Sequence, residues 1–211
     1  MIMTIKRVTL DYGHGGEKPG ASYAGVLEKT VNLQLGNKIY SALHNLNISD
    51  SSNVPNATSL NHPINVTLTR DSDQHIPLSI RYQLINKYHT HYPIDLVVSI
   101  HFNAAPTVPQ AHGFEVYHLA GSIEGTRAAK TIIEKVVEDN FYIRGRGHKT
   151  TAELGRKLAI IHKTVPPAIL IETGFLSNEA DRNNAIDPVW QDEMANTIAA
   201  GILNYLREAE L

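Results

Sequence analysis

The chain has 211 residues, of which 42% are hydrophobic, so it is long enough to bury a full core as one domain. Its 19 basic and 21 acidic residues give a net charge of −2, which excludes broad electrostatic binding to nucleic acid or to an anionic membrane. Cysteine is absent, which excludes disulfides and leaves only nitrogen and oxygen donors for any metal. No apolar run approaches the roughly 20 residues of a spanning helix, and residues 1–7 contain no signal-like stretch, so we expect no export signal.

Short apolar runs rich in β-branched residues alternate along the chain with segments of helical spacing. Such runs are typical of strands in a sheet that is largely covered. In chain order, strands are expected at Val8–Leu10, Val66–Leu68, Leu96–Ile100, Phe114–Tyr117, Leu158–Ile161 and Ala168–Ile171. Helices are expected over Val31–Leu46, over Leu84–Tyr88 after Pro77, over Ser122–Glu138 and over Gln191–Leu206. The alternation predicts an α/β fold with about six strands.

The stretch from Asn45 to Asn65 is rich in asparagine, serine and proline and has no apolar periodicity. This composition predicts a long surface loop inside one domain, not a linker between two domains.

Two histidines stand at the ends of predicted buried strands. His14 lies in a glycine-rich turn after the first strand, and His101 follows the run Leu96–Ile100. Ligands of open α/β folds gather at the carboxyl ends of the strands, so these positions favour a binding or metal site. The glycine pattern around His14 fits neither the dinucleotide nor the Walker phosphate motif, which argues against a phosphate loop.

Two glutamates complete the candidate site. Glu28 opens an amphipathic helix, where the first-turn amides favour a carboxylate, and it could also complete a metal site with two histidines. Glu172 ends the apolar run Ala168–Ile171, and a buried strand seldom ends in an unpaired carboxylate. A zinc with three protein ligands keeps one position for water, and Glu172 suits the base that takes the proton of that water.

These segments, in this order, resemble the zinc amidases of the N-acetylmuramoyl-L-alanine amidase type 3 family over about Val8 to Leu206. The matching pieces are residues 10–16 (Leu-Asp-x-Gly-His-Gly-Gly), Glu28-Lys29, Leu68-Thr69-Arg70, Arg81, residues 99–104 (Ser-Ile-His-x-Asn-Ala), Gly113–Tyr117 and Glu172–Asn178. Tyr12 and Phe102 depart from the usual proline and alanine of the family, and neither is an expected metal ligand. Tyr12 could change how stiffly the turn presents His14.

The resemblance implies a zinc ion held by His14, Glu28 and His101, with Glu172 as the catalytic carboxylate. It also implies a twisted, mostly parallel six-stranded sheet flanked by helices, with residues 1–211 forming one catalytic domain and no separate wall-binding module. The expected reaction is hydrolysis of the amide between N-acetylmuramic acid and L-alanine in peptidoglycan. Without an export signal, the chain is most similar to a phage endolysin that is made in the cytoplasm and acts on the wall after release; a host amidase that has lost its leader is the alternative.

Two other functions stay open at this point: a zinc peptidase acting on free peptides, and an inactive wall-binding module. The second would require loss of a site residue, whereas all four are present. Among the remaining candidates, Arg70 and Arg81 are expected to be structural, and Asn103 could orient a neighbouring ligand. His112 and His118 flank a predicted strand and are left outside the site.

Overall fold

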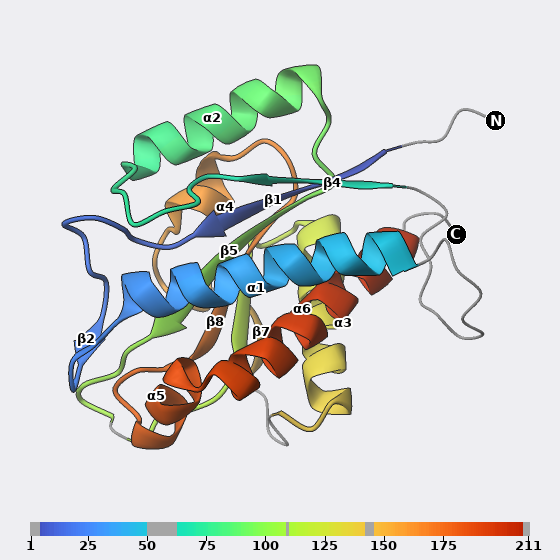
Figure 1. The fold of residues 1–211 in the computed structure, drawn as a ribbon. Coiled ribbons are helices and arrows are strands. Elements are labelled where there is room, and N and C mark those ends of the chain that lie inside the picture. The colour runs from blue at the N-terminus through green and yellow to red at the C-terminus, as the bar shows by residue number, and fades with distance from the viewer. Residues whose placement is uncertain (1–4, 50–62, 109, 142–145, 209–211) are drawn as a thin grey trace.

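A computed structural model of the chain describes residues 5–49, 63–108, 110–141 and 146–208. Its centre is a six-stranded sheet in the order β4-β1-β5-β8-β6-β7 (Figure 1). The strands are β1 (Lys6–Tyr12), β4 (Ile64–Leu68), β5 (Leu96–Asn103), β6 (Glu115–His118), β7 (Gly147–Thr150) and β8 (Ala168–Phe175). Neighbouring strands are parallel except β6 and β8, which are antiparallel. A short antiparallel pair, β2 (Ser22–Tyr23) and β3 (Val26–Leu27), lies outside this sheet.

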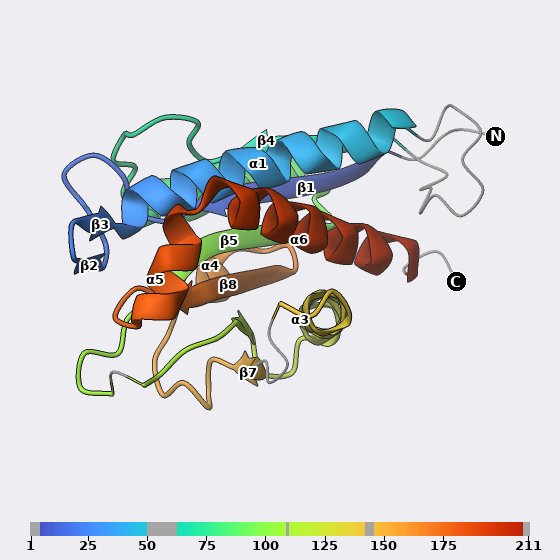
Figure 2. The ribbon, with the colours of Figure 1, turned by 60° about the horizontal axis from the view of Figure 1, so that its bottom comes forward.

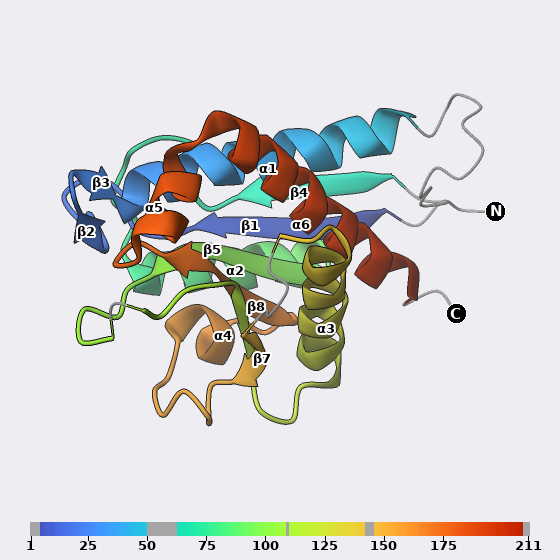
Figure 3. The ribbon, with the colours of Figure 1, turned by 90° about the horizontal axis from the view of Figure 1, so that it is seen from below.

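Helices cover both faces of the sheet. They are α1 (Glu28–Ser49), α2 (Leu78–His91), α3 (Ile123–Glu138), α4 (Ala159–Lys163), α5 (Glu179–Ile186) and α6 (Pro188–Glu208). Helices α1, α3 and α6 pack on one face, and Figures 2 and 3 show α1 and α6 side by side across it. Helices α2 and α4 pack on the opposite face. Within the part of the chain that the structure describes, no helix is both long and apolar enough to span a membrane.

The largest part of the core lies between the sheet and α1, α3 and α6. Alternate residues of the strands point into it, as Val98 and Ile100 of β5 do, because side chains alternate across a strand. Leu35 and Ile39 of α1 meet them and are fully buried, each contributing roughly 1.5–3 kcal/mol through the hydrophobic effect. Val97, on the other face of β5, packs instead with α2 and α4. Both faces of the central strands are therefore apolar, which explains their continuous hydrophobic runs.

The expected α/β class and the mostly parallel six-stranded sheet are confirmed, but one of the segments expected to be a strand is a helix. Residues 158–161 were expected to be a strand, whereas Ala159–Lys163 form α4. Four apolar residues are too few to distinguish a strand from a helical turn by periodicity. In α4, Ile160 packs towards Val97 while Ile161 packs towards Leu170, so adjacent apolar residues are both buried.

The sixth strand is β7, whose sequence Gly-His-Lys-Thr carries no apolar signal because it lies at the edge of the sheet.

The expected loop from Asn45 to Asn65 is also too long at both ends. Helix α1 continues to Ser49 and β4 begins at Ile64, while residues 50–62 lie outside the described residues. The low helix propensity of asparagine costs only a fraction of a kcal/mol per residue, so it does not stop a helix that tertiary packing supports.

Candidate active site

His14 lies in the turn that follows β1, and the glycines around it are required by close contacts. The His14 backbone is left-handed, with φ of 62°, and the turn closes onto β5 through a hydrogen bond of 3.0 Å from the Gly13 amide to the Ile100 carbonyl. A Cβ atom on Gly13 would lie 2.2 Å from Cε1 of His101. Any larger residue would therefore push the two histidines apart.

Two arginines fix the backbone of this turn through hydrogen bonds to its carbonyl groups. The Arg70 guanidinium donates to the carbonyls of Tyr12 (2.9 Å) and Gly13 (2.8 Å). Arg81 donates to the carbonyls of Tyr12 (2.5 Å) and His14 (2.6 Å). The expectation that both arginines are structural is confirmed. Tyr12 is fully buried, so the departure from proline is accommodated in the core while its carbonyl helps to fix the turn.

Asp11, near the end of β1, contacts β5, α2 and the residue that follows β4. It accepts hydrogen bonds from Thr69 (2.6 Å) and Ser99 (2.7 Å) and forms an ion pair with Arg81 (2.8 Å). Burial alone would raise the pKa of Asp11, but Arg81 and the two hydroxyl donors outweigh it, so the pKa is below its usual value. The charged pair therefore keeps Arg81 in place under His14.

Glu28 joins the two histidines at the start of α1. Its Oε1 lies 2.8 Å from Nδ1 of His101, and its Oε2 lies 3.0 Å from Nε2 of His14. The Ala21 amide donates to Oε2 at 2.8 Å, and the side chain is buried, with 4% of the residue exposed. Burial raises the pKa of Glu28, but the two histidines lower it by more, and the pKa falls far below the usual range. Glu28 is therefore a carboxylate at neutral pH.

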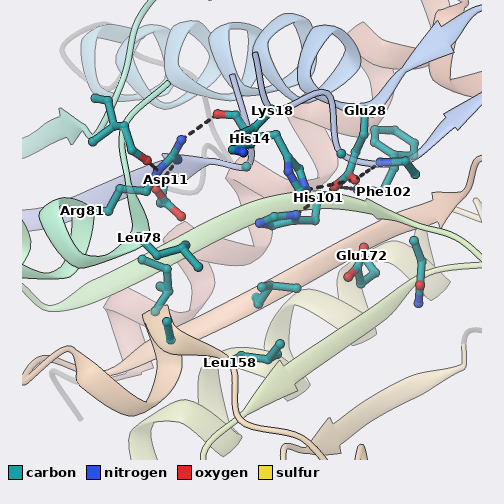
Figure 4. Close-up of a pocket in the computed structure, with 18 of the residues that line it drawn as sticks. Asp11, His14, Lys18, Glu28, Leu78, Arg81, His101, Phe102, Leu158 and Glu172 are labelled. Atoms are coloured by element: carbon teal, nitrogen blue, oxygen red, sulfur yellow. Dashed lines mark hydrogen bonds and ion pairs between the residues drawn. The ribbon is translucent and has the colours of Figure 1, made fainter. Parts of the chain in front are cut away.

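His14, Glu28 and His101 together form a group that could hold a metal ion. One donor atom from each residue lies within 4.8 Å of the others, and the two imidazole rings meet edge to face with their centroids 5.1 Å apart. Two nitrogen donors and one carboxylate oxygen form a ligand set that suits zinc in a site with one open position. Figure 4 shows the three side chains converging on one point. The three positions expected from the sequence are thus brought together.

Glu172 lies on β8, directly opposite His101 in the strand register, and faces the same cavity (Figure 4). Only 7% of the residue is exposed, and within the described residues its Oε2 has no hydrogen-bond partner. Burial raises the pKa of Glu172 well above the usual range, and the nearby charges of Glu28 and Glu115 raise it further. A divalent cation beside Glu28 would oppose this shift, because positive charge stabilises the carboxylate.

Glu115 lies on the other side of Glu172 in the sheet and is fully paired. It accepts from Lys149 (2.6 Å), from the Tyr117 hydroxyl (2.7 Å) and from Arg146. The Asn103 amide also donates to Glu115 (3.2 Å), and no hydrogen bond joins Asn103 to the His101 ring. Asn103 therefore supports the Glu115 cluster and does not orient His101 by direct contact.

These residues surround a cavity of about 990 Å³. Its walls come from the His14 turn, from the start of α2, from the end of β5 and from residues 156–160, of which only 158–160 belonged to an expected strand. Arg156, Lys157 and Lys18 also line the cavity, and no sequence pattern singled them out because they are basic residues in loops without a motif around them. His112 and His118 are not among the lining residues, as expected.

A parallel α/β sheet with a His, Glu, His donor group and a lone buried carboxylate at the carboxyl ends of its strands is typical of a metal-dependent hydrolase. The sequence profile of the N-acetylmuramoyl-L-alanine amidases matches residues 8–204. The chain belongs to this family.

Individual relatives agree with this assignment. The chain is 30% identical over 203 residues to an endolysin of Bacillus phage SPP1, covering 95% of this chain and 66% of the endolysin. It is 29% identical to a germination-specific N-acetylmuramoyl-L-alanine amidase of Bacillus subtilis, covering 96% of this chain and 81% of that protein. Among solved structures, the N-acetylmuramoyl-L-alanine amidase AmiC2 of Nostoc punctiforme is similar with a TM-score of 0.78 and 28% identity, covering 96% of this chain and 97% of the other.

Proposed function

We propose that the chain uses zinc to hydrolyse the amide bond between the lactyl group of N-acetylmuramic acid and L-alanine in peptidoglycan. The observation that carries this proposal is a His14, Glu28 and His101 group that shares one cavity with Glu172, whose Oε2 has no hydrogen-bond partner among the described residues, in a member of the amidase family. Because the chain has no cysteine, its metal ligands are nitrogen and oxygen donors. Two histidines and one carboxylate are a ligand set of catalytic zinc.

In this proposal each group has a separate task. Zinc, when bound, would polarise the amide carbonyl and lower the pKa of a water molecule. Glu172 accepts a proton as the water oxygen attacks the carbonyl carbon, and passes it to the alanine nitrogen as the C–N bond breaks. The products are a glycan with a free lactyl carboxylate and a peptide with a free amino group.

The surroundings of Glu172 support this role. Burial favours its protonated form, as does the lack of a partner on Oε2 within the described part of the chain, and a group must be protonated before it can donate to a leaving nitrogen. The positions of Asp11 and Arg81 support the role of His14, because they fix the turn that carries it.

For the physiological role we propose cell lysis after release to the wall, as for an endolysin, following the 30% identity to the SPP1 protein. Turnover of the host's own wall is the second candidate, because the Bacillus subtilis amidase is similar at 29% identity.

The proposed reaction is tested by digesting purified peptidoglycan with and without a chelator and identifying the new ends by mass spectrometry. We expect free L-alanine amino groups and intact glycan strands, no digestion with chelator, and recovery on addition of zinc. New ends inside the peptide stem would instead indicate a peptidase. Binding to the wall without new ends would indicate an inactive module.

A further inference from the structure

Several basic side chains line the cavity, and they differ in whether the described residues offer them a partner. Arg81 lines the cavity but is fully engaged with Asp11 and backbone carbonyls. By contrast, the side chains of Lys18, Arg156 and Lys157 form no hydrogen bond or ion pair within the described parts of the chain. Arg156 and Lys157 are adjacent and exposed, so they place two free cations on one wall. The donors of Arg156 are therefore available to a ligand.

Arg156 lies on the side of the cavity that carries Glu172, because Leu158, two residues further along the chain, packs with Leu170 of β8, which points to the same face of the strand as Glu172. Its charge acts on Glu172, lowering the pKa that burial, the larger effect, raises. The next acid along the sheet, Glu115, is already paired with Arg146 and Lys149 and does not neutralise Arg156. Lys18 lies beside His14, across the cavity from Leu158, which follows the two cations in the chain (Figure 4). Arg156 and Lys157 thus lie on one side of the cavity, and Lys18 lies on the other.

The proposed reaction, on which this inference rests, fixes the direction of the substrate. Glu172 delivers its proton to the alanine nitrogen, so the peptide lies towards Glu172 and the glycan lies towards the far side. The peptide continues from the alanine along the wall that contains Arg156. A guanidinium offers a planar pair of donors that matches a carboxylate, and a charged hydrogen bond of this kind is stronger than a neutral one.

We infer that Arg156 binds a free carboxylate on the stem residue that follows the scissile L-alanine. The enzyme then prefers stems in which this carboxylate is free to stems in which it is amidated. Arg156 would act as a specificity residue, since it binds a part of the substrate remote from the bond that breaks.

The test uses two soluble muramyl peptides that differ only in a carboxylate or a carboxamide on the second stem residue. We expect the wild-type enzyme to favour the carboxylate by about 5- to 20-fold in kcat/KM, mostly through KM, since the contact is the same in ground and transition states. Arg156→Gln should remove the preference by slowing only the carboxylate substrate. Arg156→Lys should keep part of it, because the charge remains while the paired donors are lost.

Lys18→Gln is the matched control, because it removes a free cation from the same cavity on the side of His14. It should leave the ratio between the two substrates unchanged. The inference is overturned if the wild-type enzyme shows no preference, if Arg156→Gln slows both substrates equally, or if Lys18→Gln changes the ratio as much as Arg156→Gln does. Failure to cleave either peptide at the lactyl amide would contradict the proposed function itself, whereas cleavage without preference contradicts only the role of Arg156.

Discussion

Glu28 and Glu172 are both buried carboxylic acids in one cavity, yet their partners differ completely. Glu28 accepts from two imidazoles and a backbone amide, which stabilise its charge. Among the residues that the structure describes, none donates to Oε2 of Glu172, and its burial and its neighbours Glu28 and Glu115 disfavour its charge. A metal ligand must be ionised, whereas a group that moves a proton must be able to take either form. The two environments therefore suit two different tasks.

This division predicts the behaviour of Glu172→Gln. The change keeps the shape of the side chain and removes its proton transfer, which typically costs about 10² to 10⁴ in rate. We expect peptidoglycan hydrolysis to fall by this factor while the zinc content, measured by metal analysis, stays near one ion per chain. The melting temperature should not fall, because the amide replaces a carboxyl whose charged form has no partner in the buried site.

His14→Ala and His101→Ala are the contrasting variants, and both should lose most of their zinc. If Glu172→Gln lost its zinc as well, Glu172 would be a ligand and Glu28 would become the candidate base. Hydrolysis by Glu172→Gln at a near wild-type rate would move the catalytic role to another residue.

At the scale of elements, the sequence predicted the central strands and the residues at their ends, but not the wall opposite them. Strands β1, β5 and β8 are buried on both faces, so each leaves a continuous apolar run, and the polar residue that follows marks the edge of the sheet. This is why His14, His101 and Glu172 were recognisable. The segment 156–160 contains too short an apolar run to show its periodicity, and the exposed Arg156 has no pattern around it. Its place in the cavity follows from tertiary packing of α4 against β8.

His118 at the end of β6 contacts His148 of the neighbouring strand β7. His118 is buried, with 3% exposed, and its Nε2 lies 3.1 Å from Nδ1 of His148. Burial is the largest effect and lowers the pKa of His118; the hydrogen bond with the Leu119 carbonyl raises it by less, and smaller effects of His148, which lowers it, and of Glu153, which raises it, leave the pKa below its usual value. The folded protein therefore favours the neutral imidazole more than the unfolded chain does.

This shift predicts a loss of stability in mild acid. With a folded pKa below the unfolded value of about 6.5, the contribution of His118 is complete above that pH and is lost as the pH falls towards the folded pKa. His118→Asn should flatten the fall in melting temperature between about pH 6.5 and pH 5. The exposed His112→Asn is the control and should leave the slope unchanged. Comparing each variant with the wild type at equal metal content cancels the titration of the metal ligands. An unchanged slope in His118→Asn would show that this pair does not couple folding to pH.

At the scale of the whole molecule, most of the hydrophobic core and the candidate active site lie in different parts of the fold. The extended core lies between the sheet and α1, α3 and α6, whereas the site is built from the last residues of β5 and β8, the turn after β1 and the start of α1. The likeness to AmiC2 covers 97% of that solved chain. The chain nevertheless spans only 66% of the SPP1 endolysin.

We therefore predict that residues 1–211 hydrolyse peptidoglycan without an added domain and that salt has little effect on the rate. The net charge of −2 provides no long-range field that draws the chain to an anionic polymer, so added salt has little attraction to screen. The charged contacts at the site, such as the Asp11 and Arg81 pair, are buried and much shorter than the screening length of about 8 Å at physiological ionic strength. Between about 50 and about 150 mM salt, digestion of purified peptidoglycan should change by less than about threefold. A small muramyl peptide measured in parallel distinguishes an effect of salt in the cavity from an effect of salt on the surrounding surface. A steep fall on peptidoglycan alone would reveal a basic binding surface outside the cavity, and a chain that cleaves the small peptide but not the polymer would require a further wall-binding region.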